Sequence, residues 1–180
     1  MLKIFTTQLQ GVFSRIAGNE DFLLEDGARL LAQALVGDGR IYIHGVREMK
    51  AIEAEAVDGA EPLQKAAPLS SLTSYQELTE TDRVLLVSRF STDEEAVHTA
   101  KALKEHGMEI VAVSTIVAAE TSGAASLEEI ADVHIDMKLK KPLIPGEDGE
   151  RFGFPSSMTA LYVYYGLAFT IKEMMEELED

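Results

Sequence analysis

Hydroxyl and guanidinium side chains follow directly after three short apolar runs of this sequence, at 41–44, 84–87 and 110–113. The residues concerned are Gly45 and Arg47 after the first run, Ser88, Arg89, Ser91 and Thr92 after the second, and Ser114 and Thr115 after the third. Arginines and hydroxyls beside free backbone N–H groups form strong hydrogen bonds to phosphate and other small anions. These residues therefore predict the binding of a small anionic metabolite.

The elements around these residues predict an α/β fold. Five short apolar segments, at 41–44, 61–66, 84–87, 110–113 and 133–137, alternate with helical patterns, which favours a three-layer sandwich with a five-stranded parallel sheet. A flavodoxin-like strand order is a common solution for such a sheet, and ligands then bind in the crevice between the first and third strands. We therefore expect Arg47 and Arg89 to meet at that crevice, together with the hydroxyls of Ser88, Ser91 and Thr92.

The other segments complete an expected single domain of 180 residues, long enough to bury roughly 70% of the unfolded chain's surface. Residues 1–37 carry two helical stripes, and Asn19 is placed to cap the second helix. Residues 40–137 form the α/β core. Residues 138–155 contain three prolines and three glycines and are expected to be an irregular loop of functional or mobile character. Residues 156–180 form a terminal helix.

Both arginines also have a purely structural interpretation, which the sequence leaves open. Arg47 can pair with Glu48, and Arg89 can pair with Asp93, so that neither guanidinium remains for a ligand. A cation near the start of a helix is unfavourable unless an anion is present, because the helix N-terminus carries a partial positive charge. The ligand interpretation and the ion-pair interpretation therefore stand beside each other.

Other candidate residues have similar alternatives. Ser91 and Glu94 have the spacing of a capping box, which alone explains a serine before a helix. Glu55 lies on the helix after the first strand and is the candidate base for proton transfer, although a solvated helix face also explains it. His44 ends the first strand and could reach the crevice.

Composition excludes several classes of function. The net charge is −15, and the one basic cluster, at Lys138, Lys140 and Lys141, is too small to bind nucleic acid. The chain has no cysteine, no spacing typical of a metal site and no Gly-rich nucleotide motif, so no metal or cofactor is expected. No apolar run approaches the roughly 18 residues of a membrane span. The first residues lack the pattern of a signal peptide, so we expect a cytoplasmic location.

On the strand RIYIHG, the block DRVLLVSRFSTDEEAVHTAKALKEHGMEIVAVST and the segment SLEEIADVHIDM, the chain resembles the sugar isomerase (SIS) domain family, in an uncharacterised, phosphoheptose-isomerase-like bacterial branch. Members of that family bind phosphosugars, and hydroxyls of the central loop hold the phosphate. By position, the first of these hydroxyls is Ser88, whereas Phe90 and Asp93 stand where the family has a serine and a threonine. A slip of one residue lets Ser91 and Thr92 fill the hydroxyl roles.

The resemblance implies three alternative functions. The first is phosphosugar binding, which could be regulatory, and the second is aldose–ketose isomerisation of a sugar phosphate with Glu55 as the base. The family's isomerases use a histidine on the last helix, and the terminal helix here contains none, which favours binding over catalysis. The third is a scaffold without a small-molecule ligand. SIS domains commonly form dimers or tetramers, so we also expect a homo-oligomer.

Overall fold

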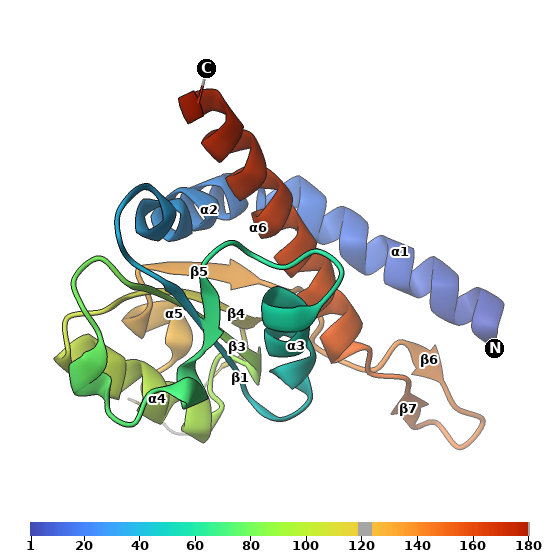
Figure 1. Ribbon diagram of the computed structural model, residues 1–180. Coiled ribbons are helices and arrows are strands. Elements are labelled where there is room, and N and C mark those ends of the chain that lie inside the picture. The colour runs from blue at the N-terminus through green and yellow to red at the C-terminus, as the bar shows by residue number, and fades with distance from the viewer. Residues whose placement is uncertain (119–123, 180) are drawn as a thin grey trace.

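A five-stranded sheet forms the centre of the molecule in a computed structural model that describes residues 1–118 and 124–179 (Figure 1). Its strands are β1 Ile41–Gly45, β2 Ala66–Pro68, β3 Arg83–Phe90, β4 Glu109–Thr115 and β5 Val133–Asp136. Neighbouring strands pair in parallel in the order β2-β1-β3-β4-β5. The predicted three-layer α/β fold with flavodoxin-like strand order is confirmed.

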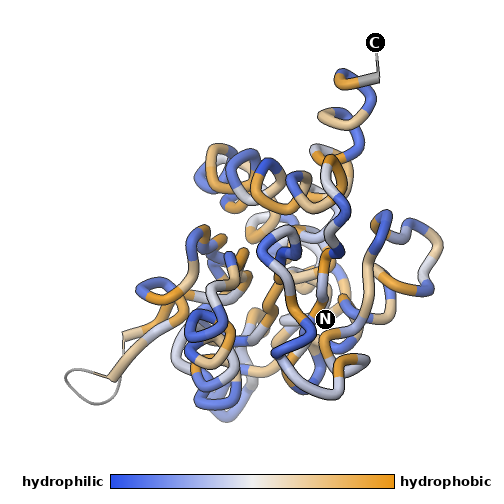
Figure 2. The backbone as a smooth tube through the Cα atoms, turned by 60° about the vertical axis from the view of Figure 1, so that its left-hand side comes forward, coloured by the Kyte–Doolittle hydropathy of each residue, from blue (hydrophilic) through white to orange (hydrophobic). Residues whose placement is uncertain are grey.

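Helices cover both faces of this sheet. One face carries α1 Leu2–Asn19, α2 Asp21–Val36, α3 Lys50–Asp58 and α6 Ser156–Glu179, and the other carries α4 Glu94–Glu105 and α5 Leu127–Ile130. Polar and apolar residues alternate around the helices, as expected for helices with one face against a core (Figure 2). The last turns of α6 project beyond the body in both views (Figures 1 and 2).

Alternation along the strands divides the core into two layers. The side chains that face α1, α2, α3 and α6 are Ile41, Ile43, Leu85, Val87, Val111, Val113, Ile135 and, just after β5, Met137. Those that face α4 and α5 are Tyr42, Val84, Leu86, Ile110 and Ala112. The strands are therefore continuous apolar runs in sequence because both of their faces are covered.

Two predicted strand boundaries are wrong. Residues 61–65 turn back onto the end of α3, so the second strand occupies only Ala66–Pro68. The third strand does not end at Val87, because β3 continues through Ser88 and Arg89 to Phe90 with a shift of register on the way. Residues expected in a loop therefore belong to a strand.

Two further local predictions need correction. Asn19 does not cap α2; it is the last residue of α1, and its side-chain amide donates to the Arg15 carbonyl at 2.8 Å. The segment 138–155 is not wholly irregular, because β6 Ile144–Pro145 and β7 Arg151–Phe152 pair as a short antiparallel ladder. The single-domain organisation stays a prediction of the sequence.

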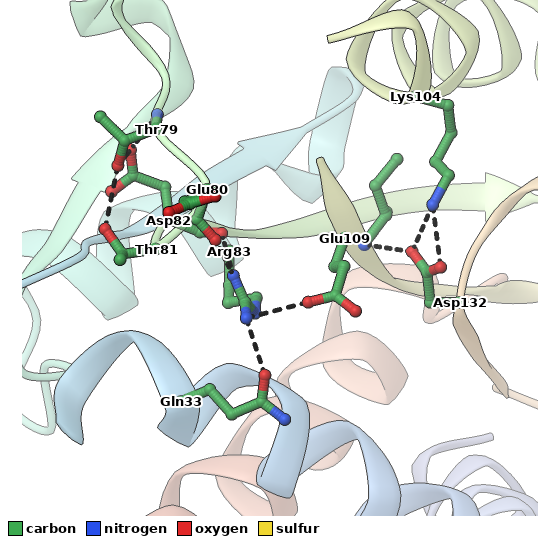
Figure 3. Close-up of polar contacts among 10 residues, drawn as sticks. Gln33, Thr79, Glu80, Thr81, Asp82, Arg83, Lys104, Glu109 and Asp132 are labelled. Atoms are coloured by element: carbon green, nitrogen blue, oxygen red, sulfur yellow. Dashed lines mark hydrogen bonds and ion pairs between the residues drawn. The ribbon is translucent and has the colours of Figure 1, made fainter. Parts of the chain in front are cut away.

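The amino-terminal edge of the sheet is closed by polar contacts (Figure 3). Arg83, at the start of β3, donates to the Gln33 side chain of α2 at 2.7 Å and lies 2.9 Å from the carboxylate of Glu109. Lys104 of α4 pairs with Asp132, just before β5, at 2.8 Å. These contacts tie the strands to both helix layers at the edge opposite the predicted ligand groups.

Candidate functional site

Gly45 sets the geometry of the chain at the carboxyl ends of β1 and β3, where the sequence predicts the ligand crevice. A Cβ at this position would overlap the backbone carbonyl of Met49, so glycine is required for the short 3-10 turn Arg47–Met49 to fold back against β1. The Val46 N–H then donates to the Val87 carbonyl at 2.9 Å. The loop after β1 is thereby fixed beside the end of β3.

Arg47 is presented at this crevice in an unusual backbone conformation. Its φ of 54° lies in the left-handed region, which costs a residue with a Cβ about 1–2 kcal/mol. Its side chain is exposed, and no carboxylate in the described part of the chain lies within ion-pair distance of it. The alternative in which Glu48 pairs with Arg47 is wrong. Backbone outliers of this kind concentrate at functional sites, where they aim a side chain.

Arg89 makes the ion pair instead, and it does so with Glu48 rather than with Asp93. The Arg89 Nε donates to the Glu48 carboxylate at 2.7 Å, and the Ser156 hydroxyl of α6 donates to the same oxygen at 2.8 Å. Partial burial alone would raise the pKa of Glu48, but the hydrogen bonds from Arg89, from its own backbone and from Ser156 lower that pKa to about 2. The Arg89 guanidinium also lies 5.9 Å from the centre of the Phe154 ring.

The two serines of the central loop use their hydroxyls inside the protein. Ser88 is fully buried, and its Oγ donates to the Phe90 carbonyl at 2.9 Å. Ser91 is also fully buried, and its Oγ accepts from the Val117 N–H at 3.2 Å. Ser91 does not cap the next helix, because α4 begins at Glu94 and its cap residue is Asp93. A ligand role for either serine stays a prediction. In that role the hydroxyl would have to give up its contact with the backbone and bond to the ligand instead.

The predicted hydroxyl groups of β4 lie on the strand next to β3, on the side away from β1. Ser114 and Thr115 are both fully buried, and the Ser114 Oγ lies 2.7 Å from Nε2 of His134 on β5. Burial lowers the pKa of His134 to about 4, so the ring is neutral at physiological pH. Thr92 is half-buried in the turn before α4. Of this group, Ser114 already has a partner, and Thr115 does not.

Three buried polar atoms at this edge have no hydrogen-bond partner: Nε2 of His44, Oδ2 of Asp93 and Oγ1 of Thr115. They come from the end of β1, the start of α4 and the end of β4, so they lie along the carboxyl edge of the sheet, with β3 between the two strands. Each unpartnered buried group costs about 1–3 kcal/mol. Burial lowers the pKa of His44, so its ring is a neutral donor and acceptor. These three are among the five buried side-chain atoms without a partner that the described residues contain.

Glu55, the predicted base, lies apart from these groups. Its carboxylate accepts from the Tyr165 hydroxyl of α6 at 3.1 Å and from the Glu61 N–H at 3.1 Å. Those contacts are with the terminal helix and with the turn that leads to β2. The structure therefore brings Gly45, Arg47 and Arg89 to one crevice and places Glu55 outside it.

Sequence reasoning missed the network that links the crevice to α6. Ser156 and Glu48 are separated by 108 residues, and their contact follows only from the way α6 crosses the end of β3. The aromatic contact between Phe90 and Phe154, with ring centres 5.8 Å apart, has the same origin. Neither pair has a local sequence signal.

Metal and membrane sites have no support in the described chain. No group of three or more His, Asp or Glu residues within 1–118 and 124–179 is arranged to hold a metal ion. Over the same residues, no helix combines the length and apolar character needed to cross a membrane.

The fold is an SIS-type three-layer α/β sandwich, as the sequence predicted. Within this class the chain belongs to the family described as "Domain of unknown function (DUF2529)", whose family model matches residues 1–175. "Uncharacterized protein YwjG" of Bacillus subtilis (strain 168) is 50% identical over 179 residues, which cover 98% of this chain and 99% of YwjG.

Two solved structures are similar in fold. The Vibrio vulnificus NanR protein complexed with ManNAc-6P matches with a TM-score of 0.71 and 15% identity, covering 99% of this chain. The chain spans only 64% of the NanR chain. The c3406 protein of E. coli CFT073 matches with a TM-score of 0.68 and 15% identity, over 97% of this chain and 89% of that one. At these identities the likeness establishes the fold alone.

Proposed function

We propose that this chain binds a sugar phosphate in the crevice between β1 and β3 and acts as a sensing or regulatory domain. The observation that carries the proposal is that the carboxyl edge of the sheet holds both the unpartnered buried atoms of His44, Asp93 and Thr115 and the exposed guanidinium of Arg47. Sugar hydroxyls both donate and accept hydrogen bonds, so they can pair with the free atoms of the histidine, the carboxylate and the threonine. A phosphate can pair with the Arg47 guanidinium. The complex of NanR with ManNAc-6P supports this class of ligand.

Binding without turnover is favoured over aldose–ketose isomerisation. Interconversion requires a positioned acid and base within reach of the sugar. Glu55 is engaged by Tyr165 and by the backbone of Glu61 instead. A sugar phosphate that binds should therefore be recovered unchanged after long incubation, which NMR of the sugar carbons measures directly.

Self-association through the layer of α1, α2 and α6 is part of the proposal. The large apolar side chains exposed on the described residues are Met1, Leu2, Ile4, Phe22, Leu23, Val36, Phe152, Met158, Tyr162, Phe169 and Leu178. All of them lie on or beside this one layer, and among the described residues α4 and α5 expose none. Apolar surface gathered on one face suits a second copy of the chain. A monomer in light scattering at micromolar concentration would exclude this self-association.

A cytoplasmic location stays a prediction.

The test of ligand binding is a thermal-shift titration with ManNAc-6P, a panel of pentose and hexose phosphates, and inorganic phosphate. A ligand at a hundredfold its dissociation constant stabilises the fold by about 2.7 kcal/mol, which raises Tm by roughly 5–10 °C for a chain of this size. The shift should disappear in Arg47→Ala and persist in Arg29→Ala, whose guanidinium pairs with Glu25 and Asp26 on the surface of α2. No shift with any sugar phosphate, or an equal loss in both variants, contradicts the proposal.

A further inference from the structure

A pocket of about 340 Å³ lies between α1 and the segment that follows β5. It is lined by Gln8, Arg15, Lys138, Leu139, Lys140, Lys141, Pro142, Leu143 and Arg151. Five of these nine residues are cationic and none is acidic, although the whole chain has 16 basic and 31 acidic residues. This pocket, called the basic pocket below, is therefore a local region of positive charge on a molecule whose net charge is negative.

The backbone that carries its lysines is anchored in the core. Leu139 and Leu143, on either side of Lys140 and Lys141, are only 1% and 6% exposed. Arg151 is fixed across the same segment, because its Nε donates to the Pro142 carbonyl and its Nη2 to the Leu143 carbonyl, both at 2.8 Å. The cations are thus presented from an ordered wall, not from a free loop.

The opposite wall is a single face of α1. Gln8, Gly11 and Arg15 follow each other at helical spacing, and the Arg15 guanidinium lies over Gly11, which has no side chain to displace it. The β6–β7 hairpin lies beside the amino-terminal part of this helix, where Phe5 approaches Gly153 (Figure 1). The helix and the hairpin segment therefore enclose the pocket from two sides.

Most of these cations have no counter-charge. Lys138 is the exception, since its Nζ lies 2.6 Å from the Glu20 carboxylate and 3.1 Å from that of Asp136. For Arg15, Lys140, Lys141 and Arg151, no carboxylate of the described residues lies within ion-pair distance. Like charges held close together repel each other, and a multivalent anion between them removes that repulsion.

We propose that the basic pocket binds a phosphorylated small molecule with at least two negative charges, at a site separate from the sugar-phosphate crevice. It lies beyond β5, two strands from β3, which corresponds to about 10 Å across the sheet. None of its lining residues forms a hydrogen bond or an ion pair with Glu48 or Arg89 among the described residues. A long polyanion is disfavoured, because the surrounding surface belongs to a chain of net charge −15.

The test is calorimetric titration with inorganic pyrophosphate at low ionic strength. Wild type should bind, and the double variant Lys140→Glu, Lys141→Glu should bind at least tenfold more weakly, a loss of about 1.4 kcal/mol. Arg15→Gln removes a cation from the other wall and should weaken binding several-fold. The matched control Lys101→Glu changes an exposed lysine of α4, on the other face of the sheet, and should leave the affinity unchanged.

Crevice variants separate this site from the proposed sugar-phosphate site. Arg47→Ala should leave pyrophosphate binding intact, and the double lysine variant should still respond to a sugar phosphate that occupies the crevice. Circular dichroism should show all variants folded, because the substituted side chains are exposed. The proposal is overturned if wild type does not bind pyrophosphate, if Lys101→Glu loses as much affinity as the double variant, or if Arg47→Ala abolishes the binding.

Discussion

Replacing Glu48 by glutamine tests its ion pair with Arg89 at the carboxyl ends of β1 and β3. The pKa of Glu48 is lowered from an ordinary value of 4.5 to about 2, because the contacts of Arg89 and Ser156 outweigh the effect of partial burial. By linkage, a depression of that size corresponds to about 3 kcal/mol of stabilisation at neutral pH. The side chains of Arg89 and Glu48 are 39% and 30% exposed, so screening by solvent reduces this to about 1–2 kcal/mol.

The pH dependence has a defined direction. The folded-state pKa is depressed, so the stabilisation is fully present above pH 4.5 and is lost as the pH falls towards 2. Urea denaturation of wild type and Glu48→Gln should differ by about 1–2 kcal/mol at neutral pH, and the difference should shrink at about pH 3. Glu25→Gln, which removes one of the two surface partners of Arg29, is the control and should change the free energy of unfolding by less than about 0.5 kcal/mol.

Two results would refute this reasoning. Glu48→Gln could prove as stable as wild type at neutral pH, which would mean that the contacts of the carboxylate add nothing net. Alternatively, the difference could persist unchanged at low pH, which would assign it to packing rather than to charge.

Three other substitutions test features of the same edge. Arg47→Gly should raise the free energy of unfolding by about 0.5–1 kcal/mol, because glycine accepts the φ of 54° without strain, and urea titration would show no gain if that conformation is not adopted. Gly45→Ala should lower it by at least about 2 kcal/mol, since the new methyl group meets the Met49 backbone; a stable variant would contradict the close approach. The pKa of His134 is lowered by burial to about 4 from 6.5, so the unfolded state takes up the proton first and stability falls as pH drops from 6.5 towards 4. His134→Gln should remove that part of the pH dependence of Tm, and an unchanged profile would exclude this histidine as its source.

Local patterns were sufficient to predict the fold. Uninterrupted apolar runs such as 84–87 and 110–113 require a sheet covered on both faces, and the helical stripes between them require a parallel sheet. The expected strand order alone brings Arg47 and Arg89 to one crevice. Periodicity does not define where a strand stops, which is why β3 was predicted three residues too short.

The partners of the site residues could not be predicted in the same way. Arg89 pairs with Glu48, 41 residues away, and not with its neighbour Asp93, because the 3-10 turn after β1 lies against the end of β3. Which hydroxyls point inward is equally a matter of tertiary packing. Ser88 and Ser91 have the sequence context of ligand groups, yet their hydroxyls satisfy backbone groups in the described structure.

The way α6 is fastened gives the crevice a mechanical connection to a distant surface. Ser156 ties its first turn to Glu48, and Tyr164 and Tyr165 tie its middle to Glu61 and Glu55, near both ends of α3. With 24 residues, this helix is about 36 Å long, and its last turns project free of the body. A ligand that displaces the Glu48 turn would therefore also tilt α3 and α6. The displacement would be small at the crevice and largest at the carboxyl-terminal end of α6. Hydrogen exchange of the amides of residues 170–178, with and without a sugar phosphate, would register that movement.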